Sequence, residues 1–447
     1  MAARRAPSTT PNAAAARLAA RWATVSLAVT LVSGAWLRLA MVWPAAAMGV
    51  DLRHAVHAHS HVAFFGWLVL AAAAVAAPGV VFDTARLRWW RRVVHAIGAL
   101  SLVAWVAFFR MGYAGPTIAL SAVHVGLWIG LARLCWSMPD AAPRRWWRAA
   151  FGALVGAGAV TVVPAILAAR DVHDGWWREL AIKLFLAAFI SGFAGLATMA
   201  AVLGAHDPGD RLRWSRRTIL AMLVPLGVLY VAGAPPVAWL TLAGRAAAGA
   251  TGVATLAVVV VVVRQRPTVV WWLPLLTMSA IGGLDLLAAA GVGASLMHGR
   301  AITVAFTHAV LLAWVTPTLA LVLAPPAARR AAPAARVAVT VGTALAGVMI
   351  LAVASMGWPW AWALVASFGV SGLGLAWVAA LAGLGAAGAW AVTLFSLTGA
   401  SAPEVSHDVP ARAPDPAGLP DAGGALPALR ARADGAAAGA PLLAAPD

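Results

Sequence analysis

Long apolar stretches separated by short polar loops occupy most of the chain and decide what it can fold into. A run of about 20 mainly apolar residues crosses a hydrocarbon core of about 30 Å as a helix. About twelve such stretches are present, at residues 18–42, 57–79, 92–111, 115–136, 148–169, 176–204, 214–234, 237–263, 268–291, 299–325, 337–356 and 370–398. The sequence therefore predicts an all-α membrane protein with about 12 transmembrane helices, in contact with the lipid bilayer.

The composition excludes a water-soluble globule. Apolar residues make up 62% of the chain and charged residues only 11%, whereas charged residues are about a quarter of an ordinary soluble domain. The net charge of +17 comes from arginines that flank the apolar stretches, so it does not indicate a nucleic-acid partner. The single cysteine, Cys135, excludes a disulfide scaffold, and no C-x-x-C-H motif for covalent attachment of haem is present.

The arginines also predict the orientation of the chain, because short cytoplasmic loops of membrane proteins are enriched in Lys and Arg. Arginine clusters precede the first stretch and follow the second, fourth, sixth, eighth and tenth. An even number of spans then places both termini in the cytoplasm. We expect residues 1–17 to form a cytoplasmic N-terminal segment, residues 18–398 the transmembrane domain, and residues 399–447 a disordered cytoplasmic tail rich in Ala and Pro.

A few ionisable side chains lie inside the predicted spans, where each is energetically costly and is a candidate for function. They are His59, His61, His95, His124, Lys183, Arg245, Asp285 and His308. With the predicted span directions and a helical rise of about 1.5 Å per residue, all except His95 lie in the outer half of the membrane. Helix packing alone would not favour one leaflet, so we expect a shared buried site.

The strongest local signal is a run of four histidines within residues 54–61, at the outer start of the second span. Successive residues of a helix are rotated by about 100°, so His54, His57 and His61 fall on one face. His59 points in nearly the opposite direction to His61. One helix is therefore predicted to present imidazoles to two different sides.

Haem suits this pattern better than zinc. A zinc site needs three or four converging protein ligands, whereas a low-spin haem needs one imidazole from each of two helices. His308, on the tenth span, lies at a suitable depth to be the opposite ligand. We expect a haem b here, with Gly66 allowing a macrocycle or another helix to approach closely, and with Arg245, Lys183 or Arg300 neutralising the propionates.

The span plan and the motif H-S-H-V-A-F-F-G at residues 59–66 resemble the catalytic subunit I of the haem-copper oxidase superfamily, in its cbb-type and nitric oxide reductase branches. In that family the second and tenth helices supply the axial ligands of the low-spin haem. The resemblance implies that His59 or His61 is one ligand and His308 the other. It also implies electron transfer or reduction of O2 or NO in a bacterial cytoplasmic membrane, with a cytochrome electron donor or other respiratory subunits as partners.

The sequence departs from that family in two respects. The family carries its H-x-H on the tenth helix, whereas here the motif lies on the second. The copper ligands expected on helices six and seven are missing, because residues 176–204 and 214–234 contain no histidine. Whether the chain is an oxidoreductase therefore stays open, and His124 with the spare histidine of the second span is the candidate pair for a second haem or metal. The candidate ligands for a metal, either haem iron or copper, are His57, His59, His61 and His308.

Three other functions are compatible with parts of the pattern. Twelve spans are common in secondary transporters, although transport does not explain histidines clustered in one leaflet. The NnrS proteins, which are polytopic and haem-associated, have a similar W-H-x-H-E-M-x-F-G motif, but here Ser60 stands where the Glu is expected. The third alternative is an assembly subunit that passes haem or copper through His54 and His57.

Overall fold

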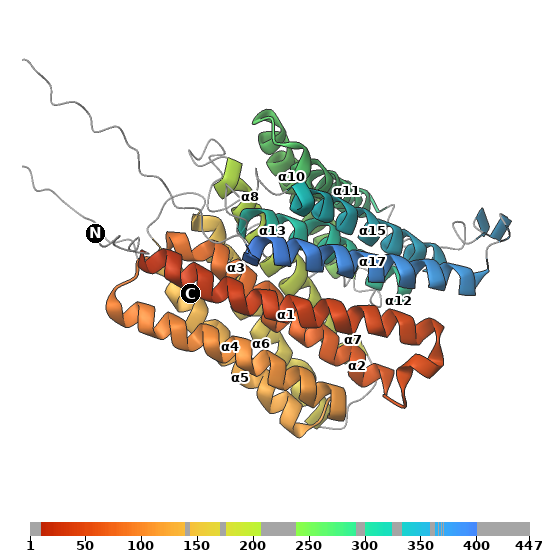
Figure 1. Ribbon diagram of the computed structural model, residues 1–447, viewed down its shortest axis with the longest axis horizontal. Coiled ribbons are helices and arrows are strands. Elements are labelled where there is room, and N and C mark those ends of the chain that lie inside the picture. The colour runs from red at the N-terminus through yellow and green to blue at the C-terminus, as the bar shows by residue number, and fades with distance from the viewer. Residues whose placement is uncertain are drawn as a thin grey trace, which may run out of the picture. The chain divides into compact units, whose positions relative to one another are not determined.

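The structure is a computed structural model (Figure 1). It describes residues 10–138, 144–169, 176–206, 238–291, 300–323, 333–357, 363, 364, 366, 367, 369 and 371–399. Within these residues, eleven helices are long and apolar enough to cross a membrane, and no β-strand occurs. The predicted all-α, multi-pass membrane architecture is confirmed for this part of the chain. The predicted span 214–234 and the predicted tail beyond residue 399 lie outside the described residues.

Eight of these spans are single α-helices. They are α1 (Pro11–Val42), α4 (Thr84–Met111), α5 (Gly115–Trp136), α6 (Arg144–Ala169), α10 (Ala238–Arg264), α11 (Trp272–Ala289), α15 (Pro333–Gly357) and α17 (Gly372–Gly399). Short 3-10 helices occur at η1 (Pro44–Ala47), η3 (Ala77–Gly79) and η7 (Val269–Trp271).

The other three spans each contain a π-helical segment between two α-helices. The second span joins α2 (Leu52–His61), η2 (Val62–Leu68) and α3 (Val69–Ala76), and it ends in η3. A later span joins α7 (Trp176–Leu186), η4 (Ala187–Gly195) and α8 (Leu196–His206). The third of these spans joins α12 (Arg300–His308), η8 (Ala309–Val315) and α13 (Thr316–Leu323).

Local capping explains where the first two spans begin. The first helix begins at Pro11 and not at residue 18, because Thr10 caps it with its side-chain oxygen and proline is well suited to the first helical turn. Asp51 caps α2 by accepting a hydrogen bond from the backbone N–H of Arg53 at 2.7 Å. This hydrogen bond holds the pKa of the Asp51 carboxyl below its usual value.

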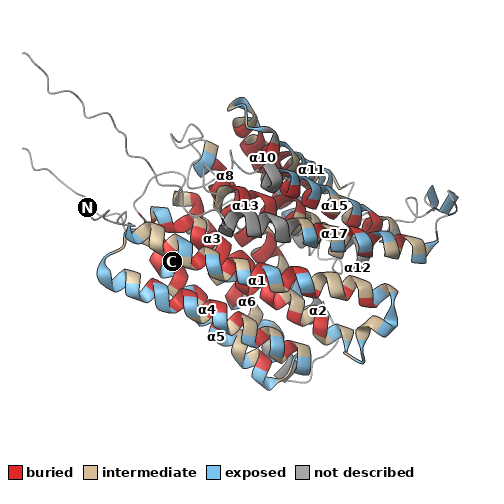
Figure 2. Cartoon of the chain, viewed as in Figure 1, coloured by how far each residue is buried: buried red, intermediate tan, exposed pale blue. Residues whose placement is uncertain are grey.

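The second span, which carries the histidine run, is the most deeply buried helix of the described bundle. Its most apolar window is 83% buried, against 28–59% for the other ten spans. Every residue of η2 is buried, and α3 is buried along almost its whole length (Figure 2). A helix that is apolar on all sides packs against neighbours on all sides. Side chains of this span can therefore meet groups from several other helices.

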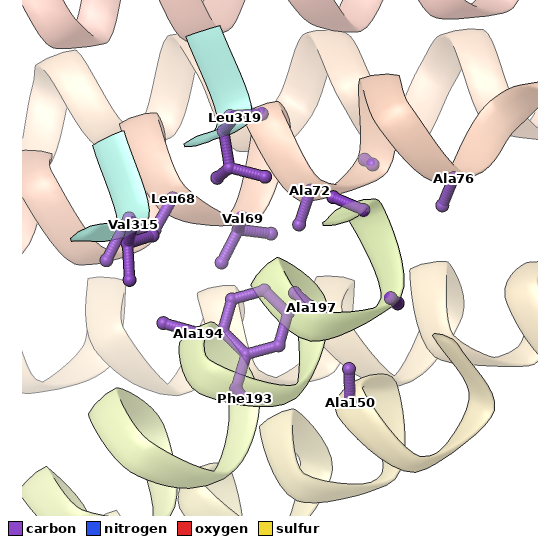
Figure 3. Close-up of a cluster of buried hydrophobic side chains, with 14 of the residues drawn as sticks. Leu68, Val69, Ala72, Ala76, Ala150, Phe193, Ala194, Ala197, Val315 and Leu319 are labelled. Atoms are coloured by element: carbon purple, nitrogen blue, oxygen red, sulfur yellow. The ribbon is translucent and has the colours of Figure 1, made fainter. Parts of the chain in front are cut away.

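The second span runs parallel to the span formed by α12, η8 and α13. In the core cluster of Figure 3, Leu68 lies close to Val315, and Ala72 lies close to Leu319. Residue numbers thus increase in the same direction along both spans. This agrees with the sequence prediction that both spans cross the membrane in the same direction.

Gly66 allows neighbouring helices to approach the centre of the bundle closely. A Cβ atom at this position would lie 2.5 Å from Ser26 Oγ of α1 and 3.2 Å from Ser101 Cβ of α4. The sequence suggests that Gly66 lets either a macrocycle or another helix approach closely. In the structure, the close neighbours of Gly66 are the helices α1 and α4.

We expect the substitution Gly66→Ala to lower the free energy of unfolding by about 1–3 kcal/mol, because the added methyl group overpacks the contact with Ser26. Denaturant unfolding of the detergent-purified protein measures this loss. Gly126→Ala in α5 is the matched control, since nothing lies within 4 Å of its Cβ position. Equal stability of the two variants would contradict the close approach at Gly66.

Candidate functional site

The histidines of α2 face two different sides of the second span, as the helical spacing predicts. His59 faces α1, where its Nδ1 lies 3.2 Å from Ser33 Oγ. His61 faces α4, where its ring stacks on Phe108 with a centroid distance of 3.8 Å and an interplanar angle of 27°. The two imidazoles therefore lie in separate environments although a single residue separates them in the chain.

On the His59 side, charged and polar groups from three helices come together. Arg38 of α1 lies near enough for its charge to act on both His59 and His308, and a charge on His59 would act on His308. Both imidazoles are half-buried. The structure thus places His308 of α12 near His59, the pairing that the sequence predicts between the second and tenth spans.

A hydrogen bond between the two spans brings this pair to one depth in the bundle. Trp67 Nε1 donates to Thr316 Oγ1 at 3.1 Å. Trp67 follows His59 by eight residues, and Thr316 follows His308 by eight residues. Because the spans are parallel, equal offsets from one contact place both histidines at about the same level.

A hydrogen bond at Nδ1 leaves Nε2 of His308 as a lone-pair acceptor, and His59 Nδ1 also has a partner. His308 Nδ1 lies 2.7 Å from the carbonyl oxygen of Val304, which only accepts, so Nδ1 carries the proton. Ser33 Oγ lies 2.7 Å from the carbonyl oxygen of Val29 and 3.2 Å from His59 Nδ1, so its oxygen accepts from Nδ1 when its single proton is donated to Val29. A neutral imidazole protonated at Nδ1 is the form that binds a metal ion through Nε2.

Backbone features next to the histidines also shape this side. A Cβ atom at Gly34 would lie 2.7 Å from His59 Cε1, so the absence of a side chain there lets the imidazole lie against α1. The π-helical segment η8 begins directly after His308, and η2 begins directly after His61. Such segments are rare and occur frequently at functional sites.

The other histidines of the run pack toward the C-terminal end of α4. His61 Nδ1 donates to the carbonyl oxygen of His57 at 2.8 Å. The ring of His57 meets Tyr113 edge-on at a centroid distance of 4.5 Å. His54 lies against Gly112, where φ is +57° and a Cβ atom would be 2.3 Å from His54 Cδ2. Aromatic and backbone contacts therefore position this face of the run.

His124 is fully buried on α5, and both of its ring nitrogens have protein partners. Its Nδ1 lies 3.0 Å from the carbonyl oxygen of Leu120, and its Nε2 lies 3.2 Å from Ser101 Oγ. Phe65 of η2 packs against the imidazole at a centroid distance of 4.9 Å. The sequence suggests His124 as a ligand of a second haem or metal, but here its Nε2 is engaged by a hydroxyl group.

The basic residue beside the histidine pair is Arg38, which was not among the residues expected from the sequence. Arg245 is exposed on α10, which packs against α8 and α11. The side chains of Lys183 and Arg300 lie outside the described residues. Arg38, which interacts with the pair, lies within the predicted span 18–42, and an arginine inside an apolar stretch was the signal that could have identified it.

Among the residues that the structure describes, no set of three or more His, Cys, Asp or Glu side chains is placed to hold a metal ion. Asp285, the acidic residue predicted for this half of the membrane, is buried on α11. Copper as a second cofactor therefore gains no support from the described side chains.

Comparisons with known proteins add no assignment to this geometry. No protein-family model matches the chain, and no curated protein matches it. The resemblance to subunit I of the haem-copper oxidases thus rests on the span plan and on the histidine pattern.

We expect Thr316→Val to lower the free energy of unfolding by about 1–3 kcal/mol, because it leaves the buried indole N–H of Trp67 without its acceptor. Thr318→Val is the matched control on the same helix. Thr318 Oγ1 is buried and has no hydrogen-bond partner within the described residues, so this variant should be at least as stable as the parent. A similar loss in both variants, measured by denaturant unfolding, would argue against the hydrogen bond between the spans.

Proposed function

We propose that this chain is a b-type haem protein of the membrane, with His59 and His308 as the two axial ligands of the iron. The observation that carries this proposal is that His59 and His308, on parallel spans, lie near enough for the charge of one to act on the other. His308 Nδ1 is held by the Val304 carbonyl and His59 Nδ1 lies at hydrogen-bond distance from Ser33, so Nε2 of each is the nitrogen that would bind the iron. This arrangement favours His59 over His61 as the ligand from the second span.

Two imidazoles match the needs of haem. The porphyrin supplies four nitrogen ligands, so the iron takes two more from the protein, whereas a zinc site takes three or four ligands from side chains. The one cysteine is buried on α5 and no covalent attachment motif is present, so the haem would be held by side chains alone. When bound, haem supplies one-electron redox chemistry.

The residues around the pair have separate roles in this proposal. The Val304 carbonyl keeps the His308 proton on Nδ1, and Ser33 orients the His59 ring. Arg38 supplies positive charge, and no carboxylate of the described chain forms an ion pair with it. Its guanidinium is therefore the group we assign to the haem propionates, in place of Arg245.

Electron transfer is the activity that this ligand set supports best. With both His59 and His308 bound to it, the haem would transfer electrons and would not bind O2 or NO. We therefore propose a role like that of the low-spin haem in subunit I of haem-copper oxidases. The proposed location is a bacterial cytoplasmic membrane, with a cytochrome donor or other respiratory subunits as partners.

Secondary transport is the second candidate function, and the π-helical segments within the spans favour it. Three described spans contain π-helical segments between α-helices, two of them directly after a histidine. Interrupted helices near the midplane form the binding sites of many transporters. In that case the histidine pair would bind a substrate or a coupled proton instead of haem.

The test is a reduced-minus-oxidised absorption spectrum of the detergent-purified protein, with a pyridine haemochrome assay on the same sample. We expect a low-spin b-type spectrum that is lost in His59→Ala and in His308→Ala. His95→Ala is the control, because its imidazole accepts a hydrogen bond from Trp22 on a different face of the bundle. A folded protein without haem would overturn the haem proposal and favour transport. Loss of the spectrum in His61→Ala alone would show that His61, on the other face of α2, is the ligand instead of His59.

The contact between Gly34 and His59 provides a finer test of the ligand assignment. In Gly34→Ala the new methyl group displaces the His59 ring, so we expect a lower haem content or a shift from low-spin to high-spin iron. Gly126→Ala, which adds a methyl group in open space, should keep the parent spectrum. An unchanged spectrum in folded Gly34→Ala would be evidence against His59 as a ligand.

A further inference from the structure

The hydroxyl group of Ser101 lies between two hydrogen-bond partners that compete for it. Ser101 Oγ is 2.7 Å from the carbonyl oxygen of Ile97 and 3.2 Å from His124 Nε2. A hydroxyl group has one proton to donate, so it donates to only one of the two at a time. Both Ser101 and His124 are almost completely shielded from the surface of the bundle.

Counting protons gives two complete hydrogen-bond arrangements for this pair. His124 Nδ1 must carry a proton in both, because its partner is the carbonyl of Leu120. When His124 is neutral, Ser101 donates to Nε2. When His124 is protonated on both nitrogens, Nε2 donates to Ser101 Oγ, and Ser101 donates to Ile97. The two arrangements differ by one proton, and the imidazole nitrogens keep their partners in each.

We propose that His124 binds and releases a proton inside the bundle, with Ser101 as its partner in both charge states. This proposal is independent of haem binding, because it concerns α4 and α5 on the side of the second span that faces away from His59. It differs from an ordinary structural histidine, for which only one protonation state has its hydrogen bonds satisfied.

A second hydroxyl group gives the proton a route away from His124. Ser26 Oγ of α1 is buried and has no hydrogen-bond partner within the described residues, and such groups usually bind ordered water. Ser26 and Ser101 both lie against Gly66, which has no side chain to separate them. We assign water bound at Ser26 as the carrier. The Nε2–H bond of His124 breaks as an O–H bond forms at Ser101, and the original Ser101 proton passes to this water.

The surroundings of His124 contain few other groups that would respond to pH. From α2, His61 interacts with it electrostatically, and from η2 it meets the ring of Phe65. The α4 neighbours are Ser101 and the Ile97 carbonyl. On the α6 side, α5 packs through Val125 and Trp128 against Gly158. His61 is thus the one titratable neighbour, among the described residues, whose charge reaches this site.

The test uses the full-length protein in lipid bilayers with 15N-labelled histidine, observed by solid-state NMR as the pH is lowered. His124→Asn identifies the His124 signals by their loss. We expect the neutral form to carry its proton on Nδ1, and the acid form to show two hydrogen-bonded N–H groups. In Ser101→Ala the protonated fraction at a given acid pH should fall about tenfold, because a hydrogen bond to a charged donor is lost.

Two further variants keep the proposal testable if Ser101→Ala does not fold. Ser101→Thr retains the hydroxyl group and should titrate like the parent, and Ser26→Ala should slow proton exchange without changing the protonated fraction more than about twofold. Ser121→Ala is the matched control, because its hydroxyl bonds only to the Thr117 carbonyl on the same helix. A neutral form protonated on Nε2, or equal titration in Ser101→Ala and Ser121→Ala, would overturn the proposal, and unchanged exchange in Ser26→Ala would overturn the route through Ser26.

Discussion

The deep burial of the second span is the constraint on which the rest of the described structure depends. A polar side chain that is shielded from water on such a helix must find its partners on neighbouring helices or on its own backbone. The histidines of this span satisfy that requirement in different ways. His59 bonds to Ser33 of α1, whereas His61 bonds to its own helix and stacks on Phe108 of α4. The central position of the helix therefore allows one short motif to serve two sites.

Small residues decide how closely the surrounding helices approach, and thereby which polar groups meet. Gly34 admits the His59 ring against α1, and Gly66 admits Ser26 and Ser101 to the same spot at the centre of the bundle. Between α10 and α11, a Cβ atom at Gly252 would lie 2.7 Å from the Gly282 carbonyl oxygen. In a bilayer, where lipid is as apolar as the side chains, such close packing contributes strongly to helix association.

The helical character and the approximate limits of the described spans followed from the sequence, because apolar stretches of membrane length have few alternatives to a helix. The opposite directions of His59 and His61 also followed, because the helical repeat is a local property. The role of Arg38 did not follow. Its distance from the histidines along the chain gives no indication that α1, α2 and α12 meet at one level, and that meeting depends on contacts such as Trp67 with Thr316.

His61, His124 and His308 show most clearly where local and tertiary effects divide. In each, Nδ1 bonds to the carbonyl oxygen four residues earlier on the same helix, so the position of the proton is a consequence of local helical structure. What lies near each ring is different: an aromatic ring for His61, a hydroxyl group for His124, and a second imidazole with an arginine for His308. The sequence alone determines the partner of Nδ1, because that carbonyl lies one helical turn away. The surroundings of Nε2 and of the ring face depend on helices that are distant in the chain. Only the packing of those helices decides whether an imidazole is placed for a metal, a proton or an aromatic contact.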